Sequence, residues 1–408
     1  MSLNKKGRFL LILLLMIASN SFAQILTHED SISAGLNVKG NRATAISGYG
    51  EAYYEQDFRN KLATARLRRT ILFIGHRFNN HITFFSEMEM EDAVVSGGSK
   101  GEISMEQCFV KFDLVPGMYI NAGLFTPRMG VMNENHLPNT FYGNERPVLE
   151  TMVIPSTWRE LGVSLYGTFP QIPGLNYSIG IFNGLQASGF TLDNGIAGGR
   201  QEGFKASARN KAIVGSLLYY AGPFRFQASG YAGGSNGADD KISSYAGLST
   251  GFMGTPVYVG DVNVQYRNKG WFGKAQITQI SIPDADRINA AFANNCPGRI
   301  SGALGEIGYD FLNKKYNGEK QLHAFGRYEF INMNGKMPET GIENPYFTQQ
   351  HFFAGLSYLP VRGVVIKADY QYIINGSFNQ SLIINPPPYQ LPFYQNRSFF
   401  KLGMAYSF

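Results

Sequence analysis

Three glutamates recur at every second position in one short segment of the sequence. Glu87, Glu89 and Glu91 alternate there with Met88 and Met90. A strand has a side-chain period of two, so the carboxylates share one face and the methionines share the other. Carboxylates in a row cannot face lipid, because each charge there costs several kcal/mol. The pattern therefore predicts a charged face that lines a wet lumen.

A basic segment precedes this acidic one and is predicted to turn back onto it. The Asn79–Asn80 turn joins the two as a hairpin, which places Arg68 opposite Glu91 and Thr70 opposite Glu89. Opposed charges in a narrow pore coordinate ions of both signs weakly. An equally weighted alternative is that Arg68 and Glu91 pair only to hold the wall. Similar alternation adds further candidates for the lumen wall, namely Arg66, Lys274, Lys367 and Asp369.

Two charged residues do not fit this assignment of faces. Arg69 falls with Leu67 and Ile71 on the side assigned to lipid, and Glu106 falls there with Cys108. Three explanations stay open: a position above the bilayer, a contact between protomers, or a β-bulge that shifts the alternation.

A second group of charges lies in the long insertion 127–159. Its candidates for a pore constriction are Arg128, Glu134, His136, Arg146 and Arg159. Arginine suits such a site because it keeps its charge and binds carboxylate or phosphate in a fork. The prolines and aromatics of the insertion favour a fixed path. We expect this loop to fold into the lumen and narrow it. The alternative is a loop over the rim that contacts solvent or a neighbouring protomer.

The sequence offers no recognisable residue set for catalysis or metal binding. The six histidines are scattered without an HExxH pair, and neither Cys108 nor Cys296 has the spacing of a metal ligand. Glu87 and Glu89 share a face, but no dedicated nucleophile accompanies them. We therefore expect no enzyme activity, no catalytic residue, no metal and no cofactor, and we expect the two thiols to be unpaired.

The two ends of the chain predict export and membrane assembly. A basic stretch precedes an apolar run at 9–18, and small residues follow at Ser21 and Ala23. This pattern predicts a signal peptide over 1–23, because the run is too short to span about 30 Å of hydrocarbon. The last strand alternates apolar and small or polar residues and ends at Phe408. A terminal strand of this kind is read by the outer-membrane assembly machinery, so Phe408 is the predicted assembly signal.

Between these ends, alternating segments are separated by connections that are short and long in turn. Charged residues make up 16% of the chain, below the roughly 25% of soluble proteins. The segments number about sixteen between 47 and 408, an even number within the porin range. We predict an all-β protein, a transmembrane antiparallel β-barrel with short periplasmic turns, long extracellular loops and an inward third loop. Residues 24–46 are assigned to an N-terminal periplasmic segment. Its alternation at 32–38 leaves open a further periplasmic or closing strand.

Several short motifs give the chain a family resemblance. They are Gly48–Tyr54 (GYGEAYY), Gly123–Pro127 (GLFTP), Ile154–Gly162 (IPSTWRELG) and Gly180–Gly184 (GIFNG), followed by the terminal Phe408. In this order they resemble the phosphate-selective porin O and P family in its Bacteroidetes form, over residues 47–408. The resemblance implies a sixteen-stranded porin, a homotrimer and an inward third loop. In that family, phosphate selectivity is associated with arginines and lysines at the constriction. Here Glu134, Glu145, Glu150 and Glu160 accompany the loop arginines.

These features predict a porin in the outer membrane of a Gram-negative bacterium. Such a channel would pass small hydrophilic solutes or ions, phosphate and other anions among the candidates. Its expected partners are outer-membrane lipids, lipopolysaccharide and the barrel assembly machinery, and no nucleic acid. The alternative is a non-conducting structural or adhesive barrel that binds surface ligands through its loops.

Overall fold

The computed structural model describes residues 43–408 except 97, 99–100, 236–244, 246, 317 and 384–391. The predicted signal peptide 1–23 and the alternation at 32–38 lie outside the described residues. The first strand begins at Ala43, so the last four residues of the predicted periplasmic segment 24–46 belong to the barrel wall.

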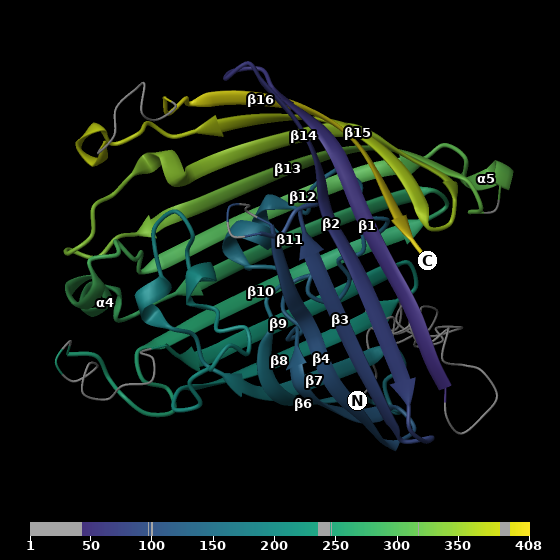
Figure 1. The fold of residues 1–408 in the computed structure, drawn as a ribbon, viewed down its shortest axis with the longest axis horizontal. Coiled ribbons are helices and arrows are strands. Elements are labelled where there is room, and N and C mark those ends of the chain that lie inside the picture. The colour runs from purple at the N-terminus through teal and green to yellow at the C-terminus, as the bar shows by residue number, and fades with distance from the viewer. Residues whose placement is uncertain are drawn as a thin grey trace, which may run out of the picture.

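Sixteen antiparallel strands form a closed barrel, which confirms the predicted fold class (Figure 1). Each strand pairs with its neighbours in the sequence, and the first and last strands pair with each other to close the wall. The strands are β1 (Ala43–Asp57), β2 (Leu62–Arg77), β3 (Ile82–Glu91), β4 (Glu102–Val115), β5 (Met118–Phe125), β6 (Glu160–Thr168), β7 (Leu175–Asn183), β8 (Lys211–Ala221), β9 (Phe224–Gly234), β10 (Pro256–Asn268), β11 (Trp271–Ser281), β12 (Arg299–Asp310), β13 (Gln321–Lys336), β14 (Thr348–Val361), β15 (Val364–Asn375) and β16 (Asn396–Ser407).

The strands are apolar outside, and their inner faces carry polar residues together with apolar residues such as Ile280 and Ile300 that belong to the buried cluster. Along β10, Val262 is 62% exposed on the outer face, whereas its neighbour Asn263 is buried on the inner face. The last strand behaves in the same way, since Leu402 and Met404 are exposed and Lys401 is buried. A closed barrel satisfies all backbone hydrogen bonds within the wall, so such an apolar outer face can contact lipid.

Connections differ between the two ends of the barrel. At the end that carries Phe408, turns such as Gly222–Pro223 join the strands, and Gly222 takes the left-handed φ of 57° that a tight turn requires. The opposite end carries the longer loops, including one with helix α4 (Ala285–Phe292). Helix α5 (Asn313–Tyr316) lies between β12 and β13. No helix in the described part of the chain is long and apolar enough to cross a membrane.

Two β-bulges explain the residues that did not fit the predicted faces. In β2 the register shifts between Leu67 and Arg69, so that Arg68 is the extra residue opposite β1. In β4 it shifts between Gln107 and Met105, so that Glu106 is the extra residue opposite β3. A bulge moves the following side chains to the other face. Arg69 and Glu106 are accordingly buried inside the barrel.

The pairing of β2 with β3 also corrects the predicted hairpin register. Arg69, and not Arg68, lies opposite Glu91, and Ile71, and not Thr70, lies opposite Glu89. The prediction was wrong by one residue on β2 because the turn after Arg77 holds more residues than Asn79–Asn80 alone.

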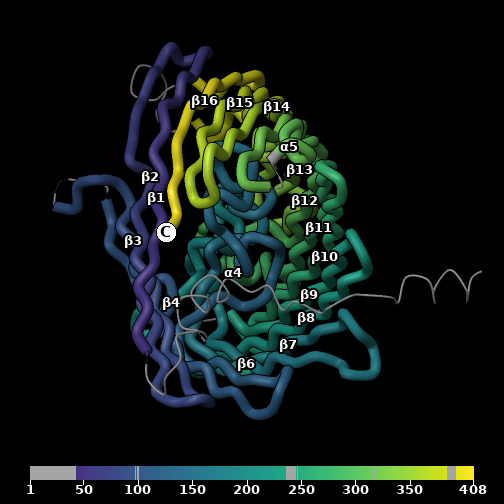
Figure 2. Tube along the Cα trace, turned by 90° about the vertical axis from the view of Figure 1, so that its right-hand side faces the viewer, coloured from purple at the N-terminus to yellow at the C-terminus, as the bar shows by residue number. Residues whose placement is uncertain are grey.

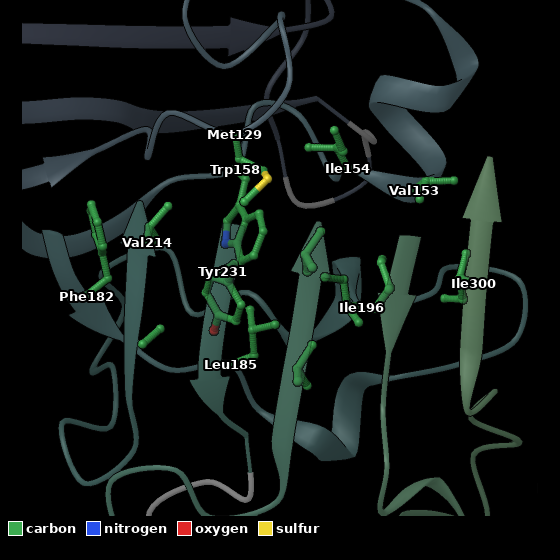
Figure 3. Close-up of a cluster of buried hydrophobic side chains, with 14 of the residues drawn as sticks. Met129, Val153, Ile154, Trp158, Phe182, Leu185, Ile196, Val214, Tyr231 and Ile300 are labelled. Carbon is green, nitrogen blue, oxygen red and sulfur yellow. The ribbon is translucent and has the colours of Figure 1, made fainter. Parts of the chain in front are cut away.

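The connection between β5 and β6, residues 126–159, folds into the barrel and is called the lumen loop below (Figure 2). It contains a π-helical turn, Leu149–Val153, whose Leu149 and Val153 are fully buried. Figure 3 shows part of the apolar cluster around it, where Trp158 of the loop lies against Tyr231 of β9 with ring centroids 4.8 Å apart. This packing gives the lumen loop a fixed path.

Candidate functional site in the barrel lumen

The far end of the lumen loop is bound to the wall opposite its own strands. The backbone N–H and the amide of Asn144 both donate to Asp369 on β15, at 2.7 and 2.6 Å. Lys367 on the same strand donates to the carbonyl of Gly143 at 2.8 Å and lies 3.9 Å from the ring centre of Phe141. Two of the predicted wall residues, Lys367 and Asp369, therefore hold the loop.

The middle of the loop is bound to its own side of the wall through His136. Its Nε2 lies 3.2 Å from Glu87 and 3.4 Å from Glu106, and its Nδ1 lies 3.2 Å from the carbonyl of Met132. Burial lowers the pKa of His136, but the two carboxylates more than reverse this effect and raise it to about 9. Both ring nitrogens face acceptors, so the imidazolium donates from Nδ1 to the carbonyl of Met132 and from Nε2 to Glu87, while its charge also lies close to Glu106.

The same three side chains could in principle hold a metal ion. The ligand atoms of Glu87, Glu106 and His136 lie within 4.8 Å of one another, and all three residues are buried. A protonated His136 already brings positive charge between the two carboxylates, so the protein can neutralise this cluster without a cation.

An ion network lies beside this cluster under the two bulges. Arg69 donates to Glu51 at 2.7 Å and to Glu89 at 3.0 Å, and all three side chains are less than 10% exposed. Glu106 also accepts a hydrogen bond from Thr157 of the loop. Glu87 and Glu89 are only 1% and 4% exposed, so these two carboxylates of the predicted acidic face are largely buried, whereas the Glu91 side chain is 37% exposed.

The lumen loop arginines differ in how well they are paired. Arg128 binds Glu134 at 2.6 Å, and Glu134 also binds Arg225 of β9. Arg159 lies 3.1 Å from Glu202 and 3.8 Å from Glu106. Arg146 has no carboxylate oxygen within 4.0 Å among the described residues, and its Nε and Nη2 are buried without a hydrogen-bond partner.

Three other predicted wall residues lie nearer the barrel ends. Arg66 binds Asp92 at 2.9 Å with a side chain that is 35% exposed. Arg68 lies 4.0 Å from Glu91, and Lys274 lies 4.0 Å from Glu306. Each of these cations is thus close to a carboxylate.

Two chambers lie on opposite sides of the lumen loop, and the outer one is the more polar. The outer chamber, at the end with the long loops, is lined by Arg68, Glu91, Glu102 and Arg146 among others and has a volume of about 1140 Å³, open to solvent. The inner chamber, beside the Gly222–Pro223 turn, has a volume of about 1470 Å³ and is also open. Lys274 lines the inner chamber.

Sequence patterns did not identify several of the residues that hold this site. Glu329 accepts the backbone N–H of Leu149 at 2.7 Å, and Arg225 and Lys401 bind Glu134 and Glu145 of the loop. Alternation along each strand places Glu329 and Lys401 on inner faces. Nothing in the sequence indicates which loop residue each one meets.

Comparison with known proteins agrees with this architecture. No protein-family model matches the sequence. An uncharacterized protein of Aquifex aeolicus is 29% identical over 349 residues, which cover 81% of this chain and 75% of that protein.

Solved structures of outer-membrane proteins are similar in fold. OmpF from Salmonella typhi, in complex with daunomycin, superposes with a TM-score of 0.57 at 12% identity, over 90% of this chain and 98% of that one. The anion-selective porin from Comamonas acidovorans gives 0.52 at 10% identity, over 90% and 100%. The trimer form of OmpT from Vibrio cholerae gives 0.51 at 11%, again over 90% and 100%.

The chain has the fold of the outer-membrane porins. A closed sixteen-stranded barrel with an apolar outer face belongs in the outer membrane of a Gram-negative bacterium, as the sequence predicted.

Proposed function

We propose that the protein is a porin, a water-filled channel through which small hydrophilic solutes or ions diffuse across the outer membrane. The observation that carries this proposal is the pair of chambers open to solvent on either side of the lumen loop, both lined in part by charged residues, inside a barrel whose outer face is apolar. A barrel of this size leaves a lumen that wall side chains alone do not fill. The lumen loop would then set the narrowest part of the path.

The identity of the solute is a more specific part of the proposal. Phosphate and other anions are candidates through the resemblance to the phosphate-selective porin O and P family. Arg128 and Arg159 would contribute to a constriction only weakly as free positive charges, because both bind carboxylates. A field of mixed sign supports weak coordination of both kinds of ion.

We extend the proposal to a homotrimer in the outer membrane. It is supported by the family resemblance and by the fold shared with a protein solved in a trimer form. Lipids, lipopolysaccharide and the barrel assembly machinery are the further partners that this location implies.

A second candidate function is a non-conducting barrel that acts as a structural or adhesive protein. The dense packing of the lumen loop favours it, because the loop contacts wall strands on both sides and buries Trp158 and Leu149 completely. If no continuous channel connects the two chambers, the long loops would form the surface that binds ligands.

Single-channel recording of the purified protein in planar bilayers separates the two functions. A porin gives discrete conductance steps, and deletion of residues 130–152 enlarges them because it removes the constriction. Replacement of Arg146 by alanine, in the full-length barrel, shifts the reversal potential in a salt gradient toward cation selectivity. A correctly assembled wild-type barrel without conductance steps would overturn the porin function. Equal conductance of the wild type and the deletion would place the loop outside the path.

A further inference from the structure

The outer chamber contains one arginine that differs from the others. Five arginines line it, and four of them, Arg68, Arg69, Arg159 and Arg200, have a carboxylate within 4.0 Å. Arg146 has none among the described residues. Its residue is 8% exposed, and its Nε and Nη2 have no hydrogen-bond partner. The chamber is thus lined by one buried guanidinium that has neither a close carboxylate nor a hydrogen-bond partner for Nε and Nη2.

A guanidinium in this state is suited to a carboxylate. Buried donors without a partner cost free energy, and a charged donor costs more than a neutral one. The planar fork of arginine binds a carboxylate through two parallel hydrogen bonds. A solute that brings such a group would remove the cost and gain both bonds.

The rim of the same chamber carries two neighbouring carboxylates. Glu91 and Glu102 lie directly opposite each other on β3 and β4, and both line the chamber. Like charges in this relation repel. Arg68 reaches Glu91 only at 4.0 Å, and Glu102 has no cation within 4.0 Å among the described residues. The pair has room for one more positive group.

We propose that the outer chamber binds small zwitterions, such as amino acids and short peptides, with the carboxylate on Arg146 and the ammonium at Glu91 and Glu102. This inference rests on the proposed porin function and names a solute class for it. Six glutamates line the chamber against five arginines, so a multiply charged anion such as phosphate meets more negative than positive groups. A zwitterion has no net charge and satisfies both unpaired features at once.

Equilibrium binding to the full-length protein folded in detergent tests the proposal without requiring conduction. Titration calorimetry with glycylglycine is compared with N-acetylglycine, which lacks the ammonium, with glycinamide, which lacks the carboxylate, and with inorganic phosphate. We expect glycylglycine to bind at least tenfold more tightly than each of the others. Arg146→Gln should weaken glycylglycine at least tenfold, and Glu102→Gln should remove its advantage over N-acetylglycine.

Two further variants control this experiment. Arg287→Gln removes an arginine on the exposed loop helix α4, whose side chain is 56% exposed, and should leave binding unchanged. Arg146→Lys keeps the charge without the fork and should give intermediate binding, which separates loss of the site from misfolding.

The outcomes distinguish this inference from the porin function. Conductance steps in bilayers without preferential binding of glycylglycine would overturn the zwitterion site and leave the porin in place. A barrel that gives no conductance steps, but binds glycylglycine and loses this binding in Arg146→Gln, would overturn the porin function and support the zwitterion site. Phosphate that binds more tightly than glycylglycine would overturn the zwitterion class.

Discussion

Nε2 of His136 lies 3.2 Å from Oε1 of Glu87, and this contact fixes the middle of the lumen loop to the inner face of β3. Glu106, the extra residue of the bulge in β4, lies on the other side of the same nitrogen at 3.4 Å. The charge on one imidazole therefore ties the middle of the lumen loop, residues 126–159, to two strands.

This contact predicts a loss of stability at alkaline pH. Burial lowers the pKa of His136 and the carboxylates raise it, to about 9 in the folded protein against 6.5 in the unfolded chain. A folded pKa above the unfolded value means that the stabilisation is complete below pH 6.5 and is lost as the pH rises through 9. Denaturant midpoints in detergent micelles between pH 6 and pH 10 should fall accordingly.

Two histidine variants provide the control for this pH series. His136→Gln should be less stable at pH 6 and should lack the part of the decline that the wild type shows between pH 6.5 and 9. His81→Gln, at an exposed position near a turn, should decline in parallel with the wild type. Parallel curves for all three proteins would show that His136 is not charged in the fold.

The network below the bulge in β2 should be one of the most sensitive places in the wall. Arg69→Gln leaves Glu51 and Glu89 buried without their shared cation, and breaking a buried pair by removing one partner costs about 3–5 kcal/mol. Arg66→Gln removes an ion pair whose partners are 35% and 30% exposed and should cost about 1 kcal/mol or less. Urea unfolding of the two variants in one detergent measures the difference, and equal losses would mean that the buried network contributes no more than the rim pair.

Strand faces could be predicted from the sequence wherever the alternation is regular. Met88 is 44% exposed on the outside while Glu87 and Glu89 face inward, and Leu402 and Lys401 divide in the same way. Lipid and the lumen impose opposite requirements on neighbouring residues, so the pattern is strong. The same requirement marks Arg69 and Glu106 as exceptions from the sequence alone.

The bulges and the loop contacts could not be predicted in the same way. A bulge needs an extra residue but no particular residue type, so three explanations fitted Arg69 equally. Asn144 and Asp369 are separated by 225 positions in the sequence, and their pairing depends on the path of the lumen loop across the barrel. Such contacts are set by packing and leave no periodic signal.

Closure of the barrel predicts a specific role for Phe408 in assembly. Gly48 and Phe408 exchange backbone hydrogen bonds of 3.1 and 3.0 Å between the first and last strands, and the exposed ring of Phe408 lies near Tyr406. Deletion of Phe408 removes both bonds and an aromatic side chain at the membrane interface. We expect a several-fold lower yield of the heat-modifiable folded form, whereas Phe408→Tyr should assemble normally. A deletion variant that assembles as well as the wild type would show that the assembly signal lies elsewhere.

The lumen loop should control which positions of β3 react with a thiol reagent that cannot cross membranes. In a background with Cys108 and Cys296 replaced, Glu91→Cys should react quickly, because the Glu91 side chain is 37% exposed in the outer chamber. Glu87→Cys should react at least tenfold more slowly, since Glu87 is 1% exposed beneath the loop. Met88→Cys faces lipid and should not react in intact membranes.

Deletion of 130–152 should raise the rate at position 87 to near that at 91 and leave position 88 unreactive. Fast reaction at 88 would invert the assignment of faces, and an unchanged rate at 87 would show that the loop is not what covers it.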